Sequence, residues 1–98
     1  MIALSEKDPG ETYPVAFTVS GLGATETITS ATVACTVLLG TDATPSAVLS
    51  GAATINGATI TQIVTGGISG VDYKLKLTLV TSGSRTLVRA MKLPVRTK

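Results

Sequence analysis

The sequence predicts an all-β domain in which two antiparallel sheets pack into a sandwich of about seven strands. The periodic segments are dominated by Thr, Val and Ile, whose branched side chains favour a pleated surface. Turn signals interrupt the chain at intervals of roughly 8 to 12 residues, which is typical of small two-sheet domains. No segment shows the 3.6-residue apolar period of a helix beyond a turn or two. A small closed barrel is the second architecture that this pattern allows.

The 98-residue chain is long enough to close one core, so residues 1–98 are expected to form a single domain. There is one cysteine, Cys35, and no histidine, so neither a disulfide nor a histidine metal cluster can staple the fold. Stability therefore has to come from packed apolar side chains. We expect Cys35 to be inert core.

The first firm strand is expected at "TYPVAFTVS", residues 12–20, where Tyr13, Val15 and Phe17 share one face. Pro14 cannot donate a hydrogen bond to a neighbouring strand, which predicts a position at a sheet edge. The segment "ITSATVACTVLLG", residues 28–40, is the most apolar and is predicted to be a central strand. A loop, "GTDATPSA", follows it.

The segment "AATINGATI", residues 52–60, is nearly symmetric about Asn56 and Gly57, and this predicts a β-hairpin. A two-residue Asn-Gly loop favours a type I′ turn, which requires positive φ at both residues. That turn would place Ile55 opposite Ala58, Thr54 opposite Thr59 and Ala53 opposite Ile60. Asn56 and Gly57 are thus expected to have a structural role.

Glycines 66, 67 and 70 predict a tight corner before a strand that alternates strictly from Tyr73 to Leu79. Lys74 and Lys76 lie on the opposite face of that strand. The last strand, within residues 85–96, has an ambiguous frame because Arg85 and Arg89 share the parity of its apolar residues. A β-bulge would resolve this conflict. Pro94 predicts that this strand also has a free edge.

The run from Gly70 to Leu77, "GVDYKLKL", resembles the tyrosine corner of immunoglobulin-like and fibronectin type III domains. The resemblance implies that the Tyr73 hydroxyl binds a nearby backbone group while its ring joins the core. More widely, the acidic start, "ETITSATV", "GGISGVDY" and the final hairpin resemble small virion proteins of tailed phages and prophages, of the fibre–tail adaptor or head–tail accessory type. That group implies an immunoglobulin-like fold and no catalytic residues.

The chain offers little reactive chemistry. Without histidine, Ser-His-Asp and Cys-His arrangements are excluded. The six acidic residues do not follow the spacing of a calcium loop, and the glycine clusters lack the strand–turn–helix setting of a phosphate loop. We therefore predict no enzyme, no cofactor, no metal site and no small-molecule substrate.

Charge is divided unevenly along the chain. Residues 1–73 carry all six acidic residues and one basic residue, and residues 74–98 carry the other seven basic residues. The positive strands either pair with acids on neighbouring strands or form an interface that meets the acidic arm of another copy and closes a ring. Nucleic-acid binding ranks last, because stacking aromatics and a recognition helix are missing. The predicted interface residues are Lys74, Lys76, Arg85, Arg89, Lys92 and Arg96.

Taken together, these features predict a structural virion protein that acts through protein–protein contacts at the tail, neck or fibre attachment. Residues 1–11 and 94–98 are expected to be flexible until assembly. No signal peptide or membrane span is expected, which predicts synthesis in the bacterial cytoplasm. The resemblance implies a place in the virion. The alternative is a carbohydrate- or surface-binding module of a larger bacterial protein, which an exposed Tyr13 or Tyr73 ring would favour.

Overall fold

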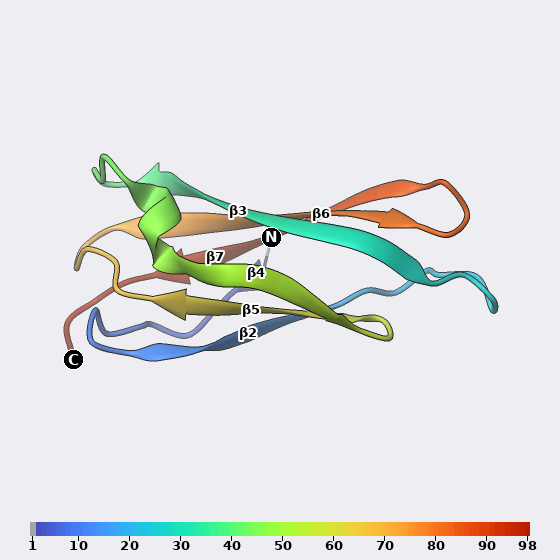
Figure 1. Ribbon diagram of the computed structural model, residues 1–98. Helices are drawn as coiled ribbons and strands as arrows, with labels where there is room; N and C mark the ends of the chain where they lie inside the picture. The colour runs from blue at the N-terminus through green and yellow to red at the C-terminus, as the bar shows by residue number, and fades with distance from the viewer. Residues whose placement is uncertain (1) are drawn as a thin grey trace.

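The alternating apolar residues form two β-sheets that pack face to face (Figure 1). The computed structural model describes residues 2–98. A single short 3-10 turn, η1 (Pro45–Val48), follows the third strand. The strands are β1 (Ile2–Ala3), β2 (Thr12–Thr18), β3 (Ile28–Leu39), β4 (Leu49–Asn56), β5 (Thr59–Thr65), β6 (Asp72–Thr81) and β7 (Thr86–Pro94).

One sheet has the strand order β1-β7-β6-β3 and the other has the order β2-β5-β4. Counted from β2 as strand B to β7 as strand G, this places B, E and D against C, F and G, as in immunoglobulin domains. This confirms the prediction of an all-β sandwich. The strands form two separate sheets and not the closed barrel that was the alternative. β1 departs from the antiparallel pattern, because it pairs parallel with β7.

The core lies between the two sheets, with β6 on one side and β2 and β5 on the other. Tyr73, Leu75, Leu77 and Leu79 are fully buried on the inner face of β6. Across from them, Val15 and Phe17 of β2 alternate with exposed residues, as the strand period requires. Pro14 lies on β2 at the edge of its sheet, so that prediction is confirmed.

The prediction that residues 28–40 form a central strand is wrong. β3 lies at the edge of its sheet, and β6 occupies the inner position between β3 and β7. The inward residues Val33 and Val37 of β3 are only half-buried, whereas those of β6 are fully buried. The number of apolar residues in a strand therefore did not identify the strand with two neighbours.

The last strand contains no bulge. β6 and β7 pair in unbroken register from Asp72 opposite Pro94 to Val80 opposite Thr86. Arg89 thus lies opposite Leu77, at an inward position, but its side chain is exposed. Arg89 can therefore occupy an inward position without being buried, because the inner face of β7 is not fully covered there. β1 pairs with Met91 and Lys92, so the edge predicted at Pro94 lies instead along the earlier part of β7.

The hairpin prediction is correct in its turn position to within one residue and wrong in its register. Ile55 lies opposite Ile60 and Asn56 opposite Thr59, so Gly57 and Ala58 form the two-residue loop. Gly57 has a φ of 61°, while Asn56 and Ala58 have negative φ. A loop with positive φ at its first position alone matches a type II′ turn, which avoids a left-handed asparagine.

The two ends of the chain lie against each other. The Lys7 amide donates to the Pro94 carbonyl at 2.9 Å, and the Arg96 amide donates to the Lys7 carbonyl at 2.9 Å. The Lys98 amide donates to an Asp8 carboxylate oxygen at 2.9 Å. Flexibility of residues 1–11 and 94–98 stays a prediction.

Amide hydrogen exchange on the isolated chain tests this prediction directly. Flexible ends would leave the Lys7 and Arg96 amides exchanging as fast as those of an unfolded peptide. Persistent contacts would instead protect both amides, together with the Leu4 amide, which donates to the Lys92 carbonyl at 2.8 Å. Protection at both ends of the monomer would contradict the idea that they order only on assembly.

Candidate interaction surfaces

Tyr73, the second residue of β6, connects the loops at one end of the sandwich. Its ring is fully buried, and its hydroxyl accepts a hydrogen bond from the Ile68 amide at 2.9 Å. The same hydroxyl donates to an Asp42 carboxylate oxygen at 2.7 Å. Burial and the bond to Asp42 raise the pKa of Tyr73 to about 12. This geometry is that of a tyrosine corner, with an added carboxylate from the loop after β3.

Arg85, one of the predicted interface residues, is held at the opposite end of the molecule by Glu26. Its guanidinium forms a salt bridge with the Glu26 carboxylate, and its Nη2 donates to the Gly21 carbonyl at 3.0 Å. Glu26 also accepts hydrogen bonds from the Gly23 amide and the Thr81 hydroxyl. One carboxylate thus joins the loop before β3 to the β6–β7 turn.

We expect this carboxylate to make stability depend on acid pH. The hydrogen bonds from Arg85, Gly23 and Thr81 lower the pKa of Glu26 from 4.5 to about 2. Because the folded pKa is depressed, the stabilisation is complete above the ordinary value of 4.5 and is lost as the pH falls toward 2. Thermal unfolding across this range should show a steeper loss of stability for the natural chain than for Glu26→Gln. Parallel pH profiles would contradict this role.

Asp72 neutralises part of the positive charge at the other end of β6. Its carboxylate is buried between Arg96, whose Nη2 lies 2.8 Å from Oδ1, and Lys92, whose Nζ lies 3.4 Å from Oδ2. Burial alone would raise the pKa of Asp72, but the hydrogen bonds from Arg96 and Lys92 outweigh it and hold this pKa below its usual value. The positive charges of Lys92 and Arg96 are therefore partly neutralised within the chain.

Lys74, Lys76 and Arg89 form no salt bridge within residues 2–98. Lys74 and Lys76 point outward from β6, and Lys74 lies directly opposite Lys92 of β7. We call the outer surface around Lys74, Lys76 and Lys92 the lysine face. Arg89 lies outside it, because its position on β7 has inward parity. The structure thus brings Lys74, Lys76 and Lys92 together on this face, and Asp72 holds Arg96 beside Lys92.

The sequence of this chain matches a known family. Residues 7–94 match the family described as Gp77, podophage GP4 fiber-tail adaptor protein gp77. The chain belongs to this family. The Gp77 match begins at Lys7 and ends at Pro94, the two residues joined by a backbone hydrogen bond, so it covers every strand from β2 to β7. No curated protein matches the chain.

Membership of the Gp77 family confirms the resemblance to a phage fibre–tail adaptor and indicates a structural role in the virion. Within residues 2–98 the Gp77-family fold brings no three His, Cys, Asp or Glu side chains together as a metal group would require. Cys35 is buried, and burial raises the pKa of its thiol to about 12. A thiol in that state is a poor nucleophile. Residues 2–98 contain no helix with the length and apolar character needed to cross a membrane.

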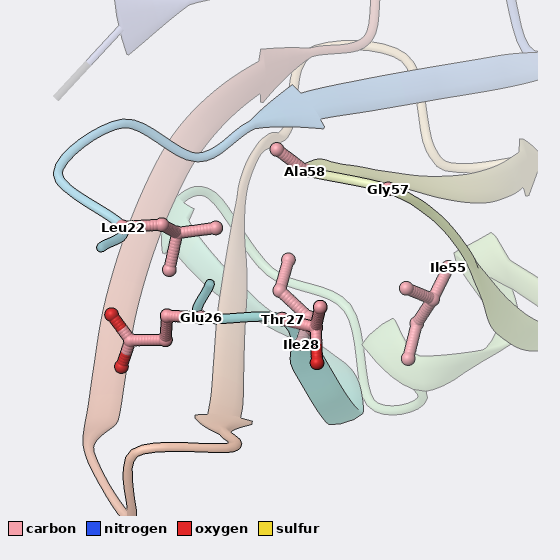
Figure 2. Close-up of a pocket in the computed structure, with 7 residues that line it drawn as sticks. All are labelled: Leu22, Glu26, Thr27, Ile28, Ile55, Gly57 and Ala58. Carbon is pink, nitrogen blue, oxygen red and sulfur yellow. The ribbon is translucent and has the colours of Figure 1, made fainter. Parts of the chain in front are cut away.

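This Gp77-family chain also has a pocket that the sequence did not predict, at the end of the sandwich where Glu26 binds Arg85. It has a volume of about 380 Å³ and lies between the loop before β3 and the tip of the β4–β5 hairpin (Figure 2). Leu22, Ile28 and Ile55 give it a mainly apolar lining, and Glu26 at its margin is already bound by Arg85. Such a lining suits an apolar side chain.

Two buried polar residues of the Gp77-family chain were also missed. Lys7 is fully buried, and its Nζ donates to the Gly66 carbonyl at 2.7 Å and to the Asp8 carbonyl at 3.0 Å. Burial lowers the pKa of Lys7. Gln62 is buried on the inner face of β5, and its amide nitrogen donates to the carbonyls of Ser50 and Gly51, where the pairing of β4 shifts register. A polar residue between Ile60 and Val64 was a readable signal for Gln62, whereas nothing local marked Lys7.

Proposed function

We propose that this chain joins a fibre to the tail of a phage or prophage virion and acts through protein–protein contacts. The Gp77-family match over residues 7–94 carries the proposal. The two outer faces of the sandwich support it, because they differ in chemistry. The lysine face is cationic, and the outward strand residues of the other sheet are all uncharged: Thr12, Pro14, Ala16, Thr18, Ser50, Thr54, Asn56, Thr59, Thr61, Ile63 and Thr65. Two unlike faces suit a part that holds two unlike partners.

The carbohydrate-binding alternative finds little support. Such sites stack sugar rings on exposed aromatic side chains, and the chain has three aromatic residues. Tyr73 and Phe17 are buried, and Tyr13 is half-buried against the core. A non-enzymatic role also forms part of our proposal, since the family is one of structural adaptors.

Assembly of several copies into a ring stays a prediction from the sequence, separate from the proposed adaptor role. A ring built on charge needs free acids in the N-terminal arm, but Glu11 pairs with Lys98 at 3.0 Å and Asp8 accepts the Gly10 and Lys98 amides. Light scattering across a salt series separates the cases. Association that weakens with added salt would support a charge-guided ring. A monomer at every salt and protein concentration would exclude self-assembly of the isolated chain.

Deletion of the gene from the phage or prophage that encodes this chain tests the proposal. We expect particles with filled heads and complete tails that lack fibres, because an adaptor is needed only for fibre attachment. The natural gene supplied in trans should restore the fibres. Heads that fail to join tails would instead place the protein at the neck, and fibres retained on deletion particles would refute an adaptor role.

A further inference from the structure

We infer that the lysine face is the docking surface for an acidic region of another virion protein, an inference that rests on the proposed adaptor function. Lys74 and Lys76 form no salt bridge within residues 2–98, and Lys92 shares Asp72 with Arg96. Asp72 is the one carboxylate among the outward strand residues of β3, β6 and β7. Positive charge on this face is therefore left uncompensated.

The surroundings of the lysines suit a flat protein contact. Lys76 lies between Ala34 of β3 and Ala90 of β7, and Lys74 lies beside Thr36 of β3. These neighbours are small and carry no charge. Farther along the same face, Val80 and Val88 are 37% and 47% exposed, which offers apolar contact next to the charges. Protein interfaces usually combine an apolar core with a polar rim.

A second copy of this chain does not fit the lysine face. A symmetric contact would place lysines against lysines, and like charges across an interface are repulsive. A head-to-tail contact would need free carboxylates, yet Asp8, Glu11, Glu26, Asp42 and Asp72 each have a hydrogen bond or ion pair within the chain. Among the acidic residues of the described chain, residues 2–98, Glu6 has neither a side-chain hydrogen bond nor an ion pair. Charge complementarity therefore points to a different protein.

Nucleic acid fits the lysine face less well than an acidic protein does. Single strands bind where aromatic rings stack on bases, and duplexes bind where a helix or ribbon enters a groove. The three aromatic residues of this chain are not on the lysine face, because Tyr73 and Phe17 are buried and Tyr13 lies on the other sheet. Lys74, Lys76 and Lys92 lie on paired strands within the sheet and not on a helix. Phosphate binding is therefore the competing outcome of the test.

The direct test measures binding of fluorescent poly-L-glutamate and, in parallel, of a DNA duplex of equal charge, by anisotropy at low ionic strength. We expect Lys74→Glu with Lys76→Glu to weaken poly-L-glutamate binding at least about tenfold, since attraction becomes repulsion. The matched control, Ala16→Glu with Thr18→Glu, adds acids at the same spacing on the uncharged face and should change binding less than about twofold. The pair Lys74→Gln with Lys76→Gln should fall between them. Unfolding curves verify that each variant is folded.

Three results would overturn the inference. These are equal losses for the two glutamate pairs, unchanged binding in the lysine variants, and DNA binding that is tighter than poly-L-glutamate binding and depends on the same lysines. A second arm adds each purified variant to particles that lack the protein, and measures adaptor and fibre on the sedimented particles. We expect the Lys74 and Lys76 variants to lose one of these two attachments. If the natural chain binds neither tail nor fibre, the adaptor proposal fails, while the anisotropy result still decides the chemistry of the face.

Discussion

Replacement of Gly67 by alanine is expected to lower the free energy of unfolding by about 3 kcal/mol. Gly67 has a φ of 96°, which an L-residue adopts only with strain. An added Cβ would also lie 2.9 Å from a methyl carbon of Val95 and 3.5 Å from the Tyr73 ring. Val95 and Tyr73 are both fully buried, so moving either side chain would disrupt close packing in the core. The melting temperature should fall by more than about 10 °C.

The neighbouring glycine provides a matched control for this prediction. Gly66 has a φ of 61°, also in the left-handed region, but a Cβ there would meet no atom within 4 Å. Gly66→Ala therefore carries the backbone strain without the clash, and we expect a loss of about 1 kcal/mol. Denaturant unfolding of the two variants separates the two contributions. Equal losses would show that close packing of Gly67 against Val95 adds nothing to stability.

The corner that contains these glycines was predicted from sequence because its signal is local. Three glycines within five residues break a strand, and the strict alternation from Tyr73 to Leu79 identifies an inner and an outer face. The same local logic placed Lys74 and Lys76 on the outer face. The alternation of side chains is a property of a single strand, so it does not depend on which strands lie beside it.

Features that depend on neighbours could not be predicted in this way. β3 was expected to be central because it is apolar, but strand order is decided by which segments pair side by side within a sheet. Arg89 suggested a bulge because its position has the parity of the buried residues. The sequence does not show that the inner face of β7 is incompletely covered there. Lys7 is buried only because residues 66 and 94, distant in sequence, close over it.

The predicted interface residues also divide into those that local pattern explains and those that depend on neighbouring segments. The structure places Arg85, Lys92 and Arg96 beside acids on other segments, and it leaves Lys74 and Lys76 without acidic partners in the described chain. The sequence showed where positive charge gathers along the chain but not which charges are neutralised after folding. That distinction separates residues that hold the fold together from those available to a partner.

Replacement of Tyr73 by phenylalanine is expected to lower the free energy of unfolding by about 2 kcal/mol. The change keeps the buried ring and removes only the hydroxyl, so the Ile68 amide and the Asp42 carboxylate each lose a partner. The Asp42 pKa, which the bond from Tyr73 holds below its usual value, should return toward 3.8. Denaturant unfolding measures the first effect, and NMR titration of the Asp42 carboxyl measures the second.

Tyr13→Phe is the matched control, because Tyr13 is half-buried and its hydroxyl has no hydrogen-bond partner within residues 2–98. We expect that variant to stay within about 0.5 kcal/mol of the natural chain. Because the folded pKa of Asp42 is depressed, its stabilisation is present above 3.8 and is lost as the pH falls below that value. The difference between the natural chain and Tyr73→Phe should therefore shrink in acid. A difference that stays constant would assign the whole effect to the Ile68 amide, and equal stability of the two tyrosine variants would show that the corner does not depend on this hydroxyl.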